Sequence, residues 1–161
     1  FFRVDTTQEI KRANVKKIDL DCEVVVISDY NKGFLTEEDI EYICSNHDNV
    51  FIDTKKILGD WVSKARFIKI NDVEYENSKQ FLTKELSEKI IHTMGGLGCE
   101  YQGKRYPTKK VEVKDLSGAG DTFISAFVVK FLETDEITPS GSPPFSIKNA
   151  SHLFLDKISS I

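Results

Sequence analysis

A short stretch near residue 120 combines the residue types that phosphate chemistry requires. Gly118, Ala119 and Gly120 form a turn of small residues, Asp121 follows it, and an apolar run occupies 123–132. That run predicts a buried helix over about 119–132, which places the turn at a helix N-terminus. Unpaired N–H groups and the positive end of the helix dipole meet there and bind phosphate or another developing anion. Because a carboxylate would otherwise repel phosphate at this point, its presence favours Asp121 as a proton acceptor.

The structural alternative is a glycine turn that only lets the helix pack closely, with Asp121 complementing the dipole. The longer string is more specific. Residues 115–123 read DLSGAGDTF, which resembles the C-terminal signature of the ribokinase-type carbohydrate kinases (the phosphofructokinase-B family), D-[ST]-[ST]-G-A-G-D-x-F. Leu116 departs from this pattern, and a hydrophobic residue there also occurs in the bacterial heptose-phosphate kinase branch. The resemblance implies that Asp121 is the catalytic base and that residues 118–120 receive the charge of the transferred phosphoryl group.

Two further motifs follow predicted strands, where ligands bind in an open parallel sheet. Residues 71–74 (NDVE) match the family's N-x-x-E, and residues 93–98 (TMGGLG) match its T-x-G-x-x-G. The resemblance implies that Glu74 organises Mg²⁺ and its waters, and that Asn71, Thr93, Gly95 and Gly98 line the nucleotide site. Taken alone, Glu74 would more often be an acid in the first turn of a helix, and residues 94–99 would more often be a hairpin turn.

Shorter similarities extend the resemblance from about residue 3 to residue 157. Residues 28–33 (SDYNKG) look like the S-D-Y-x-K-G stretch of heptose-phosphate kinases, and residues 51–55 (FIDTK) are similar to their strand ending in D-P-K. Asn149 fits the N-A step that borders the adenine. Family kinases are much longer than this chain, so we expect residues 1–161 to be the C-terminal, nucleotide-binding and catalytic portion of one kinase domain. Residues 1–5 then resemble the last strand of the family's lid.

The elements that position these motifs alternate between strand-like and helix-like segments, which predicts an α/β protein with a mostly parallel sheet. Helices are expected after Thr36, with Asp39 completing a near-match to a capping box, and from the polar cap at Asn71. The resemblance implies the three-layer αβα ribokinase-like fold without its N-terminal part. The remaining expected segments are strands at 23–29, 49–53, 66–70, 89–94, 104–106 and 110–113, a turn at 30–33, helices at 57–64 and 146–158, and a loop at 134–144.

Composition limits the classes of protein that fit. Hydrophobic residues at 40% and charged residues at 30% are ordinary for a globular domain. The net charge of −4 comes without a basic block, which argues against a nucleic-acid partner, and no apolar stretch is long enough to span a membrane. Cysteines at 22, 44 and 99 form no C-x-x-C pair, and the histidines at 47, 92 and 152 lie far apart, so we expect reduced thiols, ordinary histidines and a cytoplasmic location. There is no P-loop motif and no Rossmann fingerprint.

The resemblance implies a kinase that uses ATP and Mg²⁺ to phosphorylate a hydroxyl of a sugar or sugar phosphate. Its partners would be that small molecule and an adenine nucleotide, and we expect neither a nucleic-acid nor a membrane partner. The sequence leaves open whether the chain forms a homodimer. The stretch 28–33 favours a heptose-phosphate-like substrate. One alternative is a kinase of another alcohol such as a nucleoside, because it shares the same signature. Another is a truncated nucleotide-binding remnant without turnover, because the sugar pocket belongs mostly to the N-terminal part of the family fold.

Overall fold

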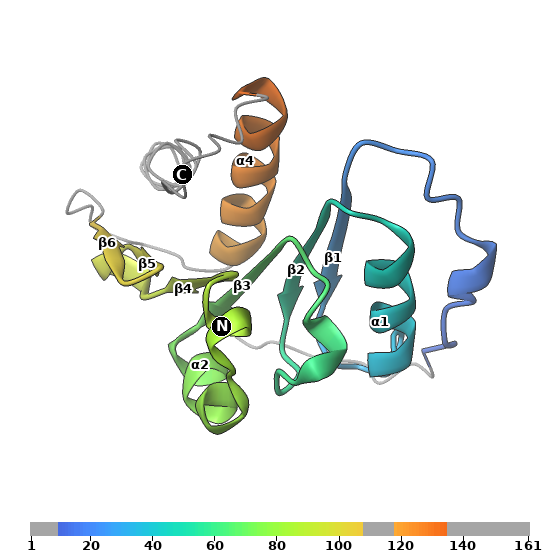
Figure 1. Cartoon of the computed structure of the whole chain (residues 1–161), viewed down its shortest axis with the longest axis horizontal. Coiled ribbons are helices and arrows are strands. Elements are labelled where there is room, and N and C mark those ends of the chain that lie inside the picture. The colour runs from blue at the N-terminus through green and yellow to red at the C-terminus, as the bar shows by residue number, and fades with distance from the viewer. Residues whose placement is uncertain (1–9, 108–117, 135–161) are drawn as a thin grey trace, which may run out of the picture.

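A computed structural model describes residues 10–107 and 118–134 of the chain, and its centre is a six-stranded sheet (Figure 1). The strands lie in sequence order, β1 to β6, and the first four run parallel, whereas β5 and β6 are antiparallel to their neighbours. Their bounds are Val25–Asp29 (β1), Val50–Thr54 (β2), Phe67–Asn71 (β3), Ile90–Thr93 (β4), Cys99–Tyr101 (β5) and Lys104–Tyr106 (β6). The predicted mostly parallel α/β sheet is confirmed.

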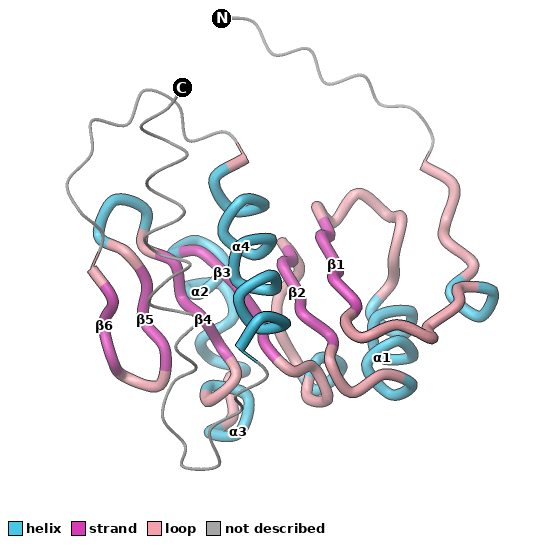
Figure 2. Tube along the Cα trace, turned by 90° about the horizontal axis from the view of Figure 1, so that it is seen from above, coloured by secondary structure: helices cyan, strands magenta, loops and turns pink. Residues whose placement is uncertain are grey.

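Helices cover both faces of this sheet, which gives three layers (Figures 1 and 2). The described α-helices are α1 (Glu37–Asn46), α2 (Asp72–Ser78), α3 (Lys84–Ser87) and α4 (Ala119–Thr134). Short 3₁₀ turns occupy Val15–Lys17, Asp60–Val62, Lys79–Phe81 and Gly95–Leu97. One hydrophobic core lies between the sheet and helices α1 to α3. A second lies between the opposite face of the sheet and α4.

Alternating side chains of the central strands feed these two cores. In β2, Val50 and Ile52 face α1, whereas Phe51 faces α4. The ring of Phe67 in β3 meets that of Phe127 in α4 edge to face, with centroids 5.0 Å apart. A strand that is buried on both faces has no polar side, which is why these segments read as continuous apolar runs.

The predicted capping box at the start of α1 is present. The Thr36 hydroxyl accepts from the Asp39 N–H at 3.2 Å, and the Asp39 carboxylate accepts from the Thr36 N–H at 2.9 Å. The guanidinium of Arg12 donates two hydrogen bonds to the same carboxylate. Its hydrogen bonds lower the pKa of Asp39 to about 2. Local sequence therefore fixes where α1 begins.

The prediction of a helix at 57–64 is wrong, because only a 3₁₀ turn at Asp60–Val62 forms there. Gly59 is fully extended before it, and a Cβ on Gly59 would lie 3.3 Å from the Trp61 ring. Leu58 and Val62 are both buried in the α1-side core, so tertiary packing overrides the helical pattern.

Helix α4 differs from its prediction in length and in burial. It continues to Thr134, and only one side of it is buried, because Val129 is 52% exposed and Leu132 is 43% exposed. The helix covers the sheet with one face, so an apolar run on all sides does not mean burial on all sides. The predicted strand at 110–113, the loop beyond residue 134, the closing helix at 146–158 and the lid strand at 1–5 lie outside the described residues.

The described cysteines form no disulfide. Cys22 is exposed, whereas Cys44 and Cys99 are buried, and burial raises the pKa of these two thiols to about 11 and about 12 respectively. Both buried thiols are therefore unreactive core residues. Within residues 10–107 and 118–134, no helix combines the length and the apolar character that crossing a membrane requires.

Candidate active site

The predicted anion cradle lies at the start of α4. Gly118 has a φ of +77°, in the left-handed region that favours glycine, and its carbonyl accepts from the N–H of Thr122 at 3.0 Å. Gly118 therefore makes the turn from which the helix begins, and the N–H groups of the first turn have no partner within the helix. The structure thus places residues 118–121 at a helix N-terminus, as the sequence predicts.

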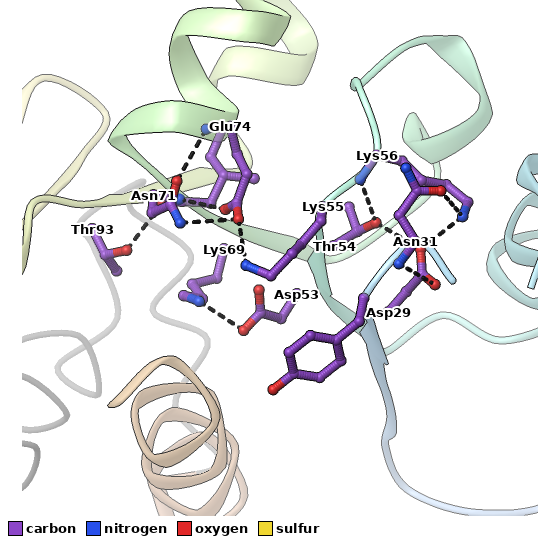
Figure 3. Close-up of polar contacts among 12 residues, drawn as sticks. Asp29, Asn31, Asp53, Thr54, Lys55, Lys56, Lys69, Asn71, Glu74 and Thr93 are labelled. Carbon is purple, nitrogen blue, oxygen red and sulfur yellow. Dashed lines mark hydrogen bonds and ion pairs between the residues drawn. The ribbon is translucent and has the colours of Figure 1, made fainter. Parts of the chain in front are cut away.

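A buried ion pair lies directly under this turn. Lys69 on β3 donates from Nζ to Oδ2 of Asp53 on β2 at 2.6 Å, and their side chains are 8% and 11% exposed. A Cβ on Gly120 would stand 2.5 Å from that Nζ and 3.4 Å from Oδ2 of Asp53. A Cβ here would crowd the ammonium, so glycine lets the helix backbone lie directly against a positive charge that Asp53 holds. We call Asp53 and Lys69 the site pair (Figure 3).

The charges of two other carboxylates act on Asp53. Burial raises the pKa of Asp53, the charge of Lys69 opposes the rise, and the charges of Glu74 and Asp121 add to it. Three acids from β2, α2 and α4 therefore meet at one edge of the sheet. Lys69 offsets part of that negative charge beside the N-terminus of α4.

Asp121, the predicted base, is held by two residues at the end of β1. Its Oδ1 accepts from the Ser28 hydroxyl at 3.2 Å, and its Oδ2 accepts from the Tyr30 phenol at 2.7 Å. The hydrogen bond to Asp121 is the main reason that the pKa of Tyr30 is raised. The side chain of Asp121 thus extends from α4 across to β1.

Asn71 and Glu74 form a second capping box at the start of α2. The Glu74 carboxylate accepts from the Asn71 N–H at 2.7 Å and from its side-chain amide at 2.9 Å, and the Asn71 side chain accepts from the Glu74 N–H at 3.0 Å. Lys55 donates to the same carboxylate at 3.0 Å (Figure 3). The expected first-turn acid is confirmed, and both oxygens of this buried carboxylate are hydrogen-bonded.

The segment after β4 makes the hairpin that was the alternative to a nucleotide loop. Met94 N–H donates to the Gly98 carbonyl at 2.8 Å, and β4 and β5 pair antiparallel. Gly95 and Gly98 both have positive φ, at 53° and 100°. Thr93 is the register partner of Asn71 and donates to the carbonyl of residue 70 at 3.1 Å. The hairpin thus lies beside the α2 cap, at the same edge of the sheet.

The donor set at this edge fits Mg²⁺, which prefers carboxylate and amide oxygens and usually keeps several waters. Within the described ranges, no group of three or more His, Cys, Asp or Glu side chains is arranged to hold a metal by itself. Glu74 and Asp53 could each bind through a water or through one oxygen. Asn149 lies outside the described residues.

Sequence reasoning missed the site pair and the contact between β1 and Asp121. A lysine inside the apolar strand 67–71 and an acid at the end of 50–54 were visible signals, because charged residues in such runs are rarely buried without a partner. Nothing local in the sequence indicates that Tyr30 reaches a residue 91 positions further along the chain.

Fold and site together define an α/β protein with a glycine-rich helix N-terminus at the carboxyl edge of a parallel sheet. Residues 6–142 match the family model described as pfkB family carbohydrate kinase. The chain therefore belongs to this family, as the resemblance implied.

Two curated relatives support the assignment. The chain is 32% identical over 130 residues to the bifunctional protein HldE of Nitratiruptor. The matched region covers 70% of this chain and 27% of that protein. It is 29% identical over 97 residues to the probable fructokinase-2 of Arabidopsis thaliana, which covers 52% of this chain and 29% of that protein. The chain thus spans less than a third of the length of each of these relatives.

Solved structures agree on the fold. A ribokinase from Thermotoga maritima superposes with a TM-score of 0.67 at 21% identity, over 94% of this chain and 55% of that one. A nucleoside kinase from Burkholderia thailandensis, solved with inosine, superposes with a TM-score of 0.64 at 15% identity, over 90% of this chain and 52% of that one. The chain has the ribokinase-like αβα fold and spans about half of these structures.

Proposed function

We propose that this chain carries the nucleotide-binding and catalytic portion of a kinase that transfers the γ-phosphoryl group of ATP to a hydroxyl of a sugar or sugar phosphate. One observation carries the proposal most directly. Asp121 and the turn at 118–120 lie at a single helix N-terminus, with the ammonium of Lys69 against Gly120. A base, N–H donors and a fixed cation at one point are what phosphoryl transfer to an alcohol requires.

Asp121 would take the proton of the acceptor hydroxyl as that oxygen attacks the γ-phosphorus. A carboxylate is a weak base, so its contribution depends on proximity and orientation more than on basicity. Its two hydrogen bonds from β1 fix that orientation.

The N–H groups of residues 118–120 would receive the charge that develops on the transferred phosphoryl group. Loss of one such donor typically costs about 3 kcal/mol of barrier. Lys69 adds a positive charge that is held by Asp53 and therefore needs no reorganisation when the phosphoryl group arrives.

Glu74 would hold Mg²⁺ through water, with Asn71 beside it, because these oxygens lie next to the cradle at the sheet edge. When bound, Mg²⁺ would neutralise phosphate charge that otherwise opposes ionised Asp121. Thr93, Gly95 and Gly98 would line the nucleotide, and Asn149 would lie near its base.

The heptose-phosphate-like substrate rests on the stretch 28–33 and on the similarity to HldE, whereas likeness to a nucleoside kinase solved with inosine favours the alternative of a nucleoside acceptor. A panel of sugars, sugar phosphates and nucleosides in an ATP-turnover assay separates these acceptors. We expect little turnover from the 161 residues by themselves, because the family's sugar pocket lies mostly outside this portion. Robust turnover by the purified chain would show that more of the acceptor site lies here.

Asp121→Asn tests the mechanism in any longer polypeptide that carries this segment. We expect it to abolish phosphorylation while nucleotide affinity stays nearly intact or improves slightly, because the amide cannot take the proton and no longer repels phosphate. Glu74→Gln should lower the rate less and weaken the dependence on Mg²⁺. Wild-type turnover by Asp121→Asn would leave Asp121 as a helix-terminal charge only.

A further inference from the structure

Three described helices carry an acid as their third residue, and these acids behave in two ways. In α1 and α2, Asp39 and Glu74 fold back and accept from the N–H that precedes the helix, at 2.9 and 2.7 Å. This is the usual placement, because it satisfies an unpaired N–H group and complements the helix dipole. Asp121 is the third residue of α4, so the same placement is open to it.

Asp121 does not take that placement. Within the described parts of the chain, the donors to its carboxylate are the Ser28 and Tyr30 hydroxyls, at 3.2 and 2.7 Å, and none is a backbone N–H of α4. The carboxylate therefore does not itself cap the N–H groups at the start of its own helix. Those are the groups that the proposed function assigns to the phosphoryl group.

We propose that Ser28 and Tyr30 are positioning residues that hold the Asp121 carboxylate away from the N-terminus of α4. Their two hydrogen bonds keep the base on the acceptor side and keep the N–H groups of the cradle free for the anion. This inference rests on the proposed function for its catalytic meaning, although the contact itself does not.

The end of β1 is built to carry such a pair. Ser28 and Tyr30 flank Asp29, which points to the opposite face, where it accepts from the Thr54 hydroxyl at 2.9 Å and pairs with Lys56 at 3.0 Å. This buried contact anchors the backbone between the two hydroxyls. The Tyr30 ring lies 5.7 Å from Nζ of Lys55, so the phenol is held from a second side.

Loss of both hydroxyls would remove the donors that compete with the helix for this carboxylate. Asp121 would then fold back onto the N–H of Gly118, the residue that precedes α4, as Asp39 and Glu74 do at the start of their helices. A carboxylate in that place repels phosphate and occupies its donors. The pair therefore controls anion affinity through Asp121 and not by touching the anion.

The first measurement needs no nucleotide. The hydrogen bond to Asp121 raises the pKa of Tyr30 above its ordinary value of 10.0. We expect Asp121→Ala to lower the Tyr30 pKa toward that value in an NMR titration of the tyrosine rings of the full chain, with Tyr30→Phe to assign the signal. Tyr101, whose pKa is raised mainly by burial, is the internal control and should not move.

The second measurement is a thermodynamic cycle of ATP affinity by calorimetry, in the presence of Mg²⁺. Ser28→Ala/Tyr30→Phe should weaken binding by about two- to fivefold when residue 121 is Asp, because the freed carboxylate occupies the cradle. In the Asp121→Ala background the same double substitution should change the affinity little. Tyr42→Phe, which removes a tyrosine hydroxyl from α1, is the matched control and should bind as the wild type does.

The outcomes separate this inference from the proposed function. An unchanged Tyr30 titration in Asp121→Ala would overturn the positioning contact, whatever the chain binds. A shifted titration with equal effects of the double substitution in both backgrounds would overturn the positioning role. A shifted titration without any ATP binding by the folded wild type would support the contact and count against the proposed function.

Discussion

Two buried ion pairs occupy neighbouring strand ends of the same sheet, and they differ in how completely each is enclosed. The enclosed pair, Asp29 and Lys56, lies on the face of the sheet that α1 covers, with side chains 3% and 8% exposed. The site pair, Asp53 and Lys69, lies on the α4 face, with side chains 11% and 8% exposed. Both place a lysine against an aspartate at nearly the same level of the sheet (Figure 3).

Both members of the enclosed pair have further hydrogen-bond partners. Asp29 also accepts from the Thr54 hydroxyl at 2.9 Å and from the Asn31 N–H at 3.1 Å, and Lys56 also donates to the Asn31 side chain at 2.9 Å. Buried charges stabilise a fold only when their remaining hydrogen bonds are satisfied in this way. The enclosed pair therefore holds the turn after β1 in place.

The site pair makes fewer hydrogen bonds than the enclosed pair. Among the described residues, Lys69 makes one hydrogen bond, to Asp53, although an ammonium has three donors. The backbone of Gly120 lies against it, and the N-terminus of α4 begins there. A buried ammonium with unused donors beside a helix N-terminus suits an anionic ligand, whereas the more fully hydrogen-bonded Lys56 suits a structural role.

The largest expected effect is on the enclosed pair. Lys56→Met leaves Asp29 buried without its cation, so we expect the free energy of unfolding to fall by about 3–5 kcal/mol. Urea denaturation at pH 7 measures this. The folded fraction should bind ATP with unchanged affinity, and a loss of affinity equal to that of a Lys69 variant would erase the distinction between the pairs.

Lys69→Met should weaken ATP binding more than it lowers stability, the reverse of what we expect for Lys56→Met. We expect ATP affinity to fall about tenfold or more, because a charge-assisted contact is lost. The loss of stability should be smaller than for Lys56→Met, since Asp53 already has a raised pKa and can take up a proton. Calorimetry and urea denaturation on the same preparations give both values, and a large loss of stability with unchanged ATP affinity would contradict the assignment.

Gly120→Ala tests the closeness of α4 to the site pair. The new Cβ would meet Nζ of Lys69 at 2.5 Å, so we expect a cost of about 1–3 kcal/mol in unfolding free energy. The same substitution should cost clearly less in a Lys69→Ala background, because the crowded atom is gone. Equal costs in both backgrounds would mean that the contact is not what requires glycine at 120.

The smallest expected effect is on pH dependence. Burial raises the pKa of Asp53 in the folded state above its ordinary value of 3.8. Protonation of Asp53 therefore stabilises the fold fully below pH 3.8, and this stabilisation is lost as the pH rises through the folded-state pKa. Removal of Lys69 raises that pKa further. The destabilisation by Lys69→Met should therefore grow by about 1 kcal/mol between pH 4 and pH 8 in urea titrations, and Asp53→Asn/Lys69→Met should lose this dependence.

Much of the fold could be predicted from local sequence. Parallel strands buried on both faces read as apolar runs, and the caps at Thr36 and Asn71 depend on residues three positions apart. The helix expected at 57–64 failed because extended Gly59 and the burial of Leu58 decide that segment. Where tertiary packing competes with local pattern, the pattern alone is insufficient.

The site was predictable only in part, for the same reason. Gly118 and Asp121 could be placed because a helix N-terminus is a local feature. The contact of Gly120 with Lys69 and the contact of Tyr30 with Asp121 join segments that are far apart in the chain, and no spacing rule reaches that far. The residues that complete the candidate catalytic site are therefore the ones that only the fold brings together.

The most direct test of the account is a calorimetric titration of the folded 161-residue chain with ATP in the presence of Mg²⁺. We predict saturable binding that is weaker than in an intact kinase and that weakens further in Lys69→Met but not in a Lys56 variant that remains folded. Absence of any ATP or ADP binding at millimolar ligand, with circular dichroism showing a folded chain, would contradict the claim that this edge of the sheet binds nucleotide phosphates.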